Sequence, residues 1–256
     1  MSGVSELNVA SGEGGTQPRT GRALMAIREL ILEGGLAPGD RVSELSIAEH
    51  TGISRTPIRA ALQRLEEEGL VETIPSGGYA VRSFSERDVF DAIEIRGTLE
   101  GLAARFAAER GASPARLEPL HECLTELDVL VPDLLATEEG FARYVAANKR
   151  LHALILELAE SPSLERQMER AVALPFASPS AFIMAQANIP ESRQLLIVAQ
   201  DQHRCVVEAI ANHEGARAQA IMQEHARLAA RNLKLALKSE AALERVPGGS
   251  LIRTRR

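Results

Sequence analysis

The sequence predicts a mainly α-helical fold of two units, an N-terminal winged helix-turn-helix and a C-terminal antiparallel bundle of about six helices. The first unit is indicated by two short helical segments, a tight turn and a hairpin pattern that follow one another between residues 43 and 83. The second is indicated by long stretches from residue 86 onward, in which apolar residues recur at helical spacing and prolines mark the breaks. With 256 residues, of which 45% are hydrophobic, the chain is long enough to pack both units.

Composition sets the expected boundaries of these units. Residues 1–17 are rich in Gly and Ser and show no periodicity, which is typical of a disordered tail. We expect the winged helix-turn-helix over residues 18–83 and the all-helical unit over residues 84–240. Residues 241–256 contain a Pro-Gly-Gly-Ser run and end in arginines, and we expect them to form a flexible tail.

In the first unit, each element has its own signal. Apolar residues at helical spacing predict a helix over residues 22–33. Ser43 and Ser54 are good N-caps for two further short helices, and Gly52 between them tolerates the backbone angles of a tight turn. Two β-like runs flank a glycine-rich turn and predict the hairpin of the wing: residues 70–74 and 79–81.

In the second unit, prolines separate long amphipathic segments. Helices are expected near residues 86–110, 114–131, 138–160, 162–173, 191–212 and 215–239. The stretch from Leu174 to Ile189 contains several Pro and Ser residues and is expected to be an irregular connection. Antiparallel packing of such helices would bury their apolar faces in a common bundle.

Composition also excludes several classes of protein. No apolar run approaches about 18 residues without a charge, so no membrane span is expected. The start of the chain lacks the pattern of a signal peptide, and we expect a cytoplasmic protein. Cys123 and Cys205 are far apart in the chain, which excludes a disulfide framework and a cysteine zinc site. The net charge of −6 argues against a nucleic-acid surface over the whole chain, but a small basic module can lie within it.

The second short helix has the composition of a helix that reads DNA. Its first turn would enter the major groove, where arginine pairs with guanine or clamps a phosphate, and hydroxyl groups suit phosphate oxygens. The candidate DNA-contacting residues in this turn are Ser54, Arg55, Thr56 and Arg59. Gly77 and Gly78 at the hairpin tip have no side chain to hold a DNA backbone away. The alternative is a small helical subdomain with a solvated arginine face.

The same stretch resembles the GntR family of bacterial transcription regulators. The resemblance is carried by Pro-Gly-Asp-Arg at 38–41, Ser-Arg-Thr-Pro-Ile-Arg-Ala-Ala-Leu at 54–62 and Glu-Gly-Leu-Val at 68–71. It covers residues 20–82. It implies a dimer that binds a pseudo-palindromic operator, with an effector in the helical domain that alters DNA affinity. It also adds Glu44 to the positions that contact DNA.

Three histidines and one asparagine form a second constellation. Asn148 and His152 are four residues apart on one expected helix, so they share a face. His203 and His225 each lie 11 residues from Glu214, at the turn between two antiparallel helices, so both lie about 16 Å from that turn. Three imidazoles and an amide oxygen suit a divalent transition metal, zinc in the first place, with nickel or manganese as alternatives. The other interpretation is a core in which the histidines pair with carboxylates or with each other.

The helical unit resembles the FCD ligand-binding domain of the FadR-like branch of the family, so the resemblance spans residues 20–238 in all. Many members carry Asp or Asn, then His four residues later, then two histidines on the last two long helices. The asparagine and three histidines match these positions, and Asn148 stands where many members have Asp. The resemblance therefore implies a metal, held less strongly by the neutral amide than by a carboxylate.

Arg96 and Glu100 lie four residues apart on the first long helix. On spacing alone, they form an ion pair on the surface. FCD members usually carry Arg and Glu at this spacing with the arginine turned into the pocket, so the resemblance implies that Arg96 binds the effector. Phe176 and Phe182, in the irregular connection, indicate an aromatic or extended effector at the pocket mouth.

Together these features predict a homodimeric transcription regulator that binds double-stranded operator DNA and is released by a small organic acid, in the manner of a repressor. An activator would differ only in where its operator lies. The alternative from another class is a metal-dependent enzyme on a helical bundle with an accessory DNA-binding module. The sequence has no H-E-x-x-H, no Gly-x-Ser-x-Gly and no phosphate loop, so we expect no catalysis. We expect coupling between the units at the hinge, residues 82–85.

Overall fold

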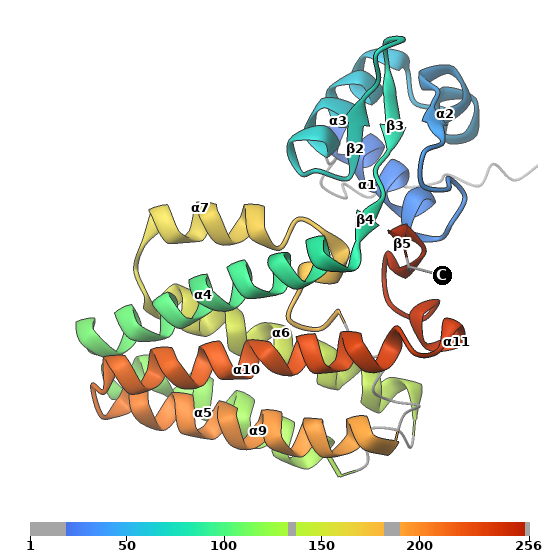
Figure 1. The fold of residues 1–256 in the computed structure, drawn as a ribbon. Coiled ribbons are helices and arrows are strands. Elements are labelled where there is room, and N and C mark those ends of the chain that lie inside the picture. The colour runs from blue at the N-terminus through green and yellow to red at the C-terminus, as the bar shows by residue number, and fades with distance from the viewer. Residues whose placement is uncertain (1–18, 133–136, 182–189, 254–256) are drawn as a thin grey trace, which may run out of the picture.

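The computed structural model describes residues 19–132, 137–181 and 190–253, and these are mainly α-helical (Figure 1). A small unit of helices and a sheet lies beside a bundle of long helices, and strand β4 (Phe84–Ser85) lies where the two meet. None of the described helices is both long enough and apolar enough to cross a bilayer. The tail expected over residues 1–17 lies outside the described residues.

The first unit is a winged helix-turn-helix. Its elements are α1 (Arg19–Leu32), β1 (Arg41–Val42), α2 (Glu44–Thr51), α3 (Arg55–Glu67), β2 (Val71–Thr73) and β3 (Tyr79–Val81). The strands form an antiparallel sheet in the order β1-β3-β2. The hairpin of β2 and β3 agrees with the expected wing. Strand β1 was not expected, because a two-residue strand is too short to show alternation in the sequence.

The turn between α2 and α3 depends on Gly52. Its φ of +67° lies in the left-handed region, and its N–H donates to the carbonyl oxygen of Ala48 at 2.9 Å, which closes α2. Ser43 caps the other end of α2, where its side chain accepts a hydrogen bond from the N–H of Ser46 at 3.3 Å. Helix α3 then buries one face in the core of the unit, through Ile58, Ala61, Leu62 and Leu65.

The second unit is a helical bundle. Its helices are α4 (Glu86–Arg110), α5 (Pro114–Leu130), α6 (Glu138–Leu158), α7 (Pro162–Ala171), α9 (Pro190–Ala211) and α10 (Gly215–Ala236). Each corresponds to one of the expected helices, so the mainly α fold with an N-terminal winged unit is confirmed. A short 3-10 turn, η1 (Pro175–Ala177), lies in the expected irregular connection.

Helices α4 and α10 lie side by side along the bundle (Figure 1). Gly97 of α4 permits this close approach, because a Cβ at Gly97 would lie 2.4 Å from the Cβ of Ala226 on α10. The approach brings two functional candidates to one cavity, Arg96 from α4 and His225 from α10.

The two units share one hydrophobic core. Ile27 and Leu62 of the first unit belong to the same buried cluster as Leu233 of α10. At the junction, Phe84 of β4 packs edge-to-face on Phe176 of η1, with ring centroids 4.8 Å apart. A second buried cluster fills the rest of the bundle. The segment that joins the units is therefore packed rather than solvated.

The C-terminal segment differs from the expected flexible tail. After α11 (Glu240–Leu243) and the turn η2 (Gly249–Leu251), strand β5 (Ile252–Arg253) pairs in parallel with β4 beside the first unit (Figure 1). The segment is anchored by four buried apolar side chains: Ala242, Val246, Leu251 and Ile252. The sequence did not reveal this, because the segment has no clear period and pairs with Phe84, far away in the chain. Residues 254–256 lie outside the described residues.

Replacing Leu251 by Ala is expected to lower the free energy of unfolding by about 2–5 kcal/mol, because this side chain is fully buried in the shared core. Guanidinium denaturation followed by circular dichroism measures the loss. Leu45→Ala is the control, because Leu45 is 60% exposed and its truncation should change the free energy by less than about 0.5 kcal/mol. Equal losses in the two variants would show that the C-terminal segment is not packed in solution.

Candidate DNA-binding surface and buried histidine site

The N-terminal part of α3 presents two arginines to solvent. The side chains of Arg55 and Arg59 are 63% and 59% exposed. Both donate to the carboxylate of Glu44, at the start of α2: Arg55 Nη2 lies 3.2 Å from Oε2, and Arg59 Nε lies 3.0 Å from Oε1. The hydrogen bond from Arg59 contributes most to holding the pKa of Glu44 below its ordinary value. Glu44 therefore stays ionised and bridges the two guanidinium groups in the DNA-free protein.

Two hydroxyl side chains lie beside these arginines. Ser54 is the N-cap of α3, but its side chain makes no capping hydrogen bond within the described chain. Ser54 and Thr56 are both exposed. The hydroxyl groups and the N–H groups of the first helical turn therefore face solvent, where they suit phosphate oxygens.

The tip of the wing is held by an arginine that the sequence analysis did not single out. Gly77 and Gly78 have φ of +82° and +90°, a region that favours glycine. Arg41 of β1 donates from Nη2 to the carbonyl oxygen of Gly77 at 2.9 Å. The side chain of Arg41 thus adds a third cation to the surface formed by α3 and the wing. The signal was present in the Pro-Gly-Asp-Arg motif, but only the pairing of β1 with β3 places this arginine at the hairpin.

Three helices bring the predicted histidines together. His152 comes from α6, His203 from α9 and His225 from α10, and one ring nitrogen from each lies within 4.8 Å of the other two. The closest pair is Nε2 of His203 and Nε2 of His225, at 3.2 Å. His203 is fully buried and His152 is 8% exposed. The equal depth inferred for His203 and His225 agrees with this arrangement.

A buried carboxylate orients His152. Its Nδ1 lies 2.8 Å from Oε1 of Glu100, on α4. Burial alone would raise the pKa of Glu100, but the charge of the Arg96 guanidinium and the hydrogen bond from His152 outweigh it and lower the pKa to about 2. The ionised carboxylate accepts a proton-bearing Nδ1, which leaves the lone pair on Nε2. That Nε2 is buried and has no hydrogen-bond partner among the described residues.

A buried amide orients His203 in the same way. Gln200 donates from Nε2 to the carbonyl oxygen of Leu124 at 3.3 Å and to Oδ1 of Asp128 at 2.5 Å. Its Oε1 is therefore the acceptor for Nδ1–H of His203, at 3.1 Å. Burial also holds the pKa of His203 and of His225 well below the ordinary value, so both rings are neutral near pH 7. The lone pair of His203 is then on Nε2, which faces His225.

This donor set fits a divalent transition metal. Nitrogen ligands about 2.0–2.1 Å from a tetrahedral zinc lie about 3.3 Å from one another, close to the spacing of the nearest histidine pair. Metal-binding histidines usually donate their other ring nitrogen to a carboxylate or carbonyl group, as His152 and His203 do here. Glu100 was not assigned this role from the sequence, because His152 lies on another helix. Gln200 lies on the same helix as His203, but the groups that fix its amide, Leu124 and Asp128, lie on α5.

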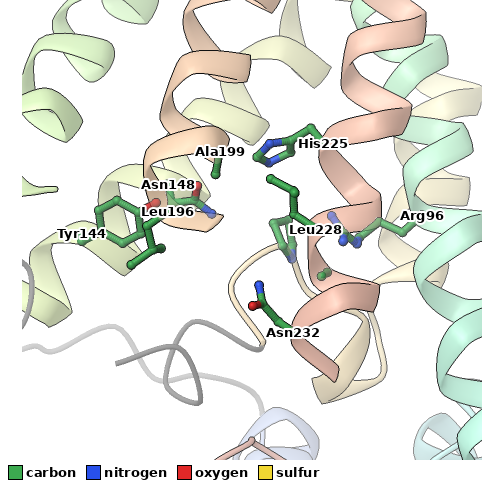
Figure 2. A pocket seen from close by; sticks show the side chains of 10 residues that line it. Arg96, Tyr144, Asn148, Leu196, Ala199, His225, Leu228 and Asn232 are labelled. Atoms are coloured by element: carbon green, nitrogen blue, oxygen red, sulfur yellow. The ribbon is translucent and has the colours of Figure 1, made fainter. Parts of the chain in front are cut away.

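Arg96 is buried and not on the surface. It is 1% exposed and forms an ion pair with Glu100, Nη1 to Oε2, at 2.6 Å. The expected i, i+4 pair therefore exists, but it lies inside the bundle. Arg96 also lines a cavity with Asn148, His225 and Asn232 (Figure 2). The cavity measures about 30 Å³, two to three times the space that one water molecule needs.

Asn148 borders the same cavity. It is 3% exposed, and its Nδ2 donates to Oγ of Ser180 at 3.2 Å. Its role as a fourth metal ligand stays a prediction. Phe176 does not lie at a pocket mouth, because its ring is fully buried against Phe84 in the shared core. Phe176 therefore does not support the prediction of an aromatic effector. Phe182, the other phenylalanine of that prediction, lies outside the described residues.

A winged helix-turn-helix with exposed arginines, joined to a helical domain with a buried histidine site, defines the class of two-domain transcription regulators. The profile of the bacterial regulatory proteins of the gntR family matches residues 20–81, and that of the FCD domain matches residues 91–228. The chain belongs to the GntR family and carries an FCD domain.

Its relatives include named repressors. A probable D-xylose utilization operon transcriptional repressor of Paenarthrobacter nicotinovorans is 32% identical over 182 residues, which are 70% of this chain and 73% of the relative. The HTH-type transcriptional repressor GlaR of Escherichia coli is 25% identical over 197 residues, 76% of this chain and 86% of the relative. Among solved structures, E. coli McbR/YncC shares the fold, with a TM-score of 0.57 and 22% identity over 84% of this chain and 99% of that chain.

These findings decide between the two classes of function. Both domains and the named relatives are those of transcription regulators. The alternative of a metal-dependent enzyme with an accessory DNA-binding module is not supported. The protein is a DNA-binding transcription regulator and not an enzyme.

Proposed function

We propose that this protein is a repressor that leaves its operator when a small carboxylate binds in the cavity of the helical domain. The observation that carries the proposal is the charge balance of the histidine site and of Arg96, which lies between that site and the cavity. The positive charge of Arg96 is balanced by Glu100, and the buried His203 and His225 are neutral. A divalent cation on the histidines would leave two positive charges uncompensated in a buried site, which an anion neutralises.

The metal in this proposal is zinc in the first place, with nickel or manganese as alternatives. Three histidines would hold it, His152, His203 and His225, with Asn148 as a weaker fourth ligand. Bound there, the ion supplies a Lewis acid with open positions for a carboxylate. Arg96 supplies a planar donor group beside it, which suits the same carboxylate.

The operator contacts follow from the exposed surface. In our proposal, Arg55 and Arg59 read bases or clamp phosphates, and Ser54 and Thr56 contact phosphates. The wing glycines, Gly77 and Gly78, approach the DNA backbone. Glu44 acts through the arginines it bridges, because a carboxylate directed at DNA would repel phosphate.

We further propose that the protein acts as a homodimer on two half-sites about one helical turn apart, as helix-turn-helix dimers do. The site of action is the cytoplasm, where a bacterial operator lies. The relatives named as repressors support repression rather than activation.

A chain of contacts joins the cavity to the DNA-binding unit. Asn148 is held in the cavity wall by the hydrogen bond that its Nδ2 donates to Ser180. A few residues earlier, Phe176 packs on Phe84, which directly follows the wing. A ligand that moves Asn148 would therefore disturb the junction at residues 82–85, the hinge expected from the sequence.

Replacing Arg96 by Lys tests the effector site. The lysine keeps a positive charge beside Glu100 but loses the planar fork that binds a carboxylate, so we expect the effector concentration needed for half release of DNA to rise about tenfold or more. Operator affinity without effector should not change. Fluorescence anisotropy of labelled operator, titrated with a panel of carboxylates in the presence of zinc, measures both quantities.

Arg105→Lys is the matched control for this variant. Arg105 forms the same i, i+4 pair with Glu109 on the same helix, at 2.7 Å, but both side chains are about half exposed. It should respond to effector as the wild type does. An Arg96→Lys variant that releases DNA at the wild-type effector concentration would show that Arg96 has only a structural role.

A further inference from the structure

The cavity extends along α10 from His225 to a second polar side chain, Asn232. Four residues of α10 line it: His225, Leu228, Ala229 and Asn232. Their spacing places them on one face of the helix, with Asn232 two turns, about 10.5 Å along the axis, from His225. Figure 2 shows the amide of Asn232 directed into the space that Arg96 and His225 also border.

Asn232 is an unpaired polar group in this wall. It is 2% exposed, and neither its Oδ1 nor its Nδ2 has a hydrogen-bond partner within the described part of the chain. Asn148, an asparagine of almost equal burial in the same cavity, does have a partner, the hydroxyl of Ser180. A buried amide without partners is unfavourable for folding, so a protein that keeps one at a cavity wall has a use for it.

We infer that Asn232 determines which carboxylate this regulator recognises, by binding a second polar group of the effector at the end remote from its carboxylate. The inference rests on the proposed carboxylate effector. An amide offers both a donor and an acceptor, so its best partner also does both. A hydroxyl or carboxamide group meets this condition, whereas a second carboxylate would leave Oδ1 unpaired and an ammonium group would leave Nδ2 unpaired. The effector class is therefore a small ω-hydroxy acid or ω-amide of a dicarboxylic acid.

The test uses the zinc-loaded 256-residue chain and matched acids of about two to seven carbons, beginning with the shortest because the cavity has room for only two to three water molecules. At each length, calorimetry compares the plain alkyl acid with its ω-hydroxy and ω-amide forms. At one length or more, we expect wild type to bind a polar form about 5- to 100-fold more tightly than the alkyl acid, because the amide gains its missing partners. In Asn232→Leu this preference should disappear, while the affinity for the alkyl acid stays within about twofold of wild type.

Thermal unfolding gives a second readout that a structural asparagine would not produce. Without effector, Asn232→Leu should melt about 2–4 °C above wild type, because it removes an unpaired buried amide and adds an apolar group of similar size. Asn232→Ala removes the amide without adding bulk and must lose the same preference for polar acids. The alanine variant therefore still tests the inference if the leucine variant fails to fold.

The outcomes separate this inference from the proposal on which it depends. If acids bind wild type but the polar forms gain nothing at any length, or if Asn232→Ala keeps the wild-type preference, Asn232 is not the specificity residue and the carboxylate proposal stands. If no acid of any form binds wild type, the carboxylate proposal is wrong and the inference is wrong with it.

Discussion

Replacing His203 by Ala is expected to remove most of the metal from the protein and to lower its melting temperature in zinc-containing buffer by roughly 8–16 °C. The ring of His203 is fully buried, its Nδ1–H is held by Gln200, and its Nε2 is directed at His225. An ion bound to the folded state alone, at 1,000 times its Kd, adds about 4 kcal/mol to the free energy of unfolding. Loss of one of three imidazoles removes most of that contribution.

Elemental analysis of protein purified without chelator measures the metal, and calorimetry measures the melting temperature with and without zinc. His121→Ala is the control, because His121 is exposed on α5 and lies outside the histidine cluster. It should keep the wild-type metal content and melting temperature. Equal metal content in His203→Ala and wild type would reject the site.

The melting temperature of the metal-free protein, prepared with a chelator, should also depend on pH, and the direction of this dependence can be predicted. Burial holds the pKa of His203 and His225 in the folded chain well below the value of about 6.5 that they have when unfolded. Below about pH 6.5 the unfolded chain therefore binds more protons, so this contribution to stability is present above that pH and is lost as the pH falls. The melting temperature should fall between about pH 7.5 and 5.5, and fall less in His203→Ala. Bound metal should be lost in the same direction, since a protonated imidazole does not coordinate.

The double replacement of Arg55 and Arg59 by Ala is expected to abolish specific operator binding. Each arginine that contacts a base should contribute about 1–3 kcal/mol to the specific complex. An arginine that contacts only a phosphate would instead weaken binding to all sequences alike and reduce its salt dependence. Both side chains are exposed and held by one carboxylate, Glu44, so their removal leaves the fold of α3 intact. Anisotropy titrations with operator and scrambled DNA at several salt concentrations separate the two cases.

Arg64→Ala is the matched control for the double variant. Arg64 lies on the same helix and its side chain is 66% exposed, but it is in the last turn, paired with Glu68. It should leave operator affinity within about 0.5 kcal/mol of wild type. Unchanged affinity in the Arg55→Ala/Arg59→Ala variant would reject α3 as the recognition helix.

Most of the helices and two of the histidines could be predicted because their signals are local or follow from symmetry. Apolar spacing located every long helix to within a few residues. The equal distances of His203 and His225 from one turn placed them at one depth, because antiparallel helices rise at the same rate. The DNA contact expected of Glu44 stays a prediction, and only the structure shows that this carboxylate bridges the two arginines.

By itself, the sequence determined the order of the elements, the arginines of α3 and the set of histidines, since these depend on residue type and on spacing along one segment. Only the tertiary structure decided that Arg96 is buried beside Glu100, that Gln200 sets the tautomer of His203 and that the amide of Asn232 lines the cavity without a partner. It also decided that the C-terminal segment is packed against β4. The physical reason is the same in each case: burial and partners are set by helices and strands that are distant in sequence and meet only when the chain is folded.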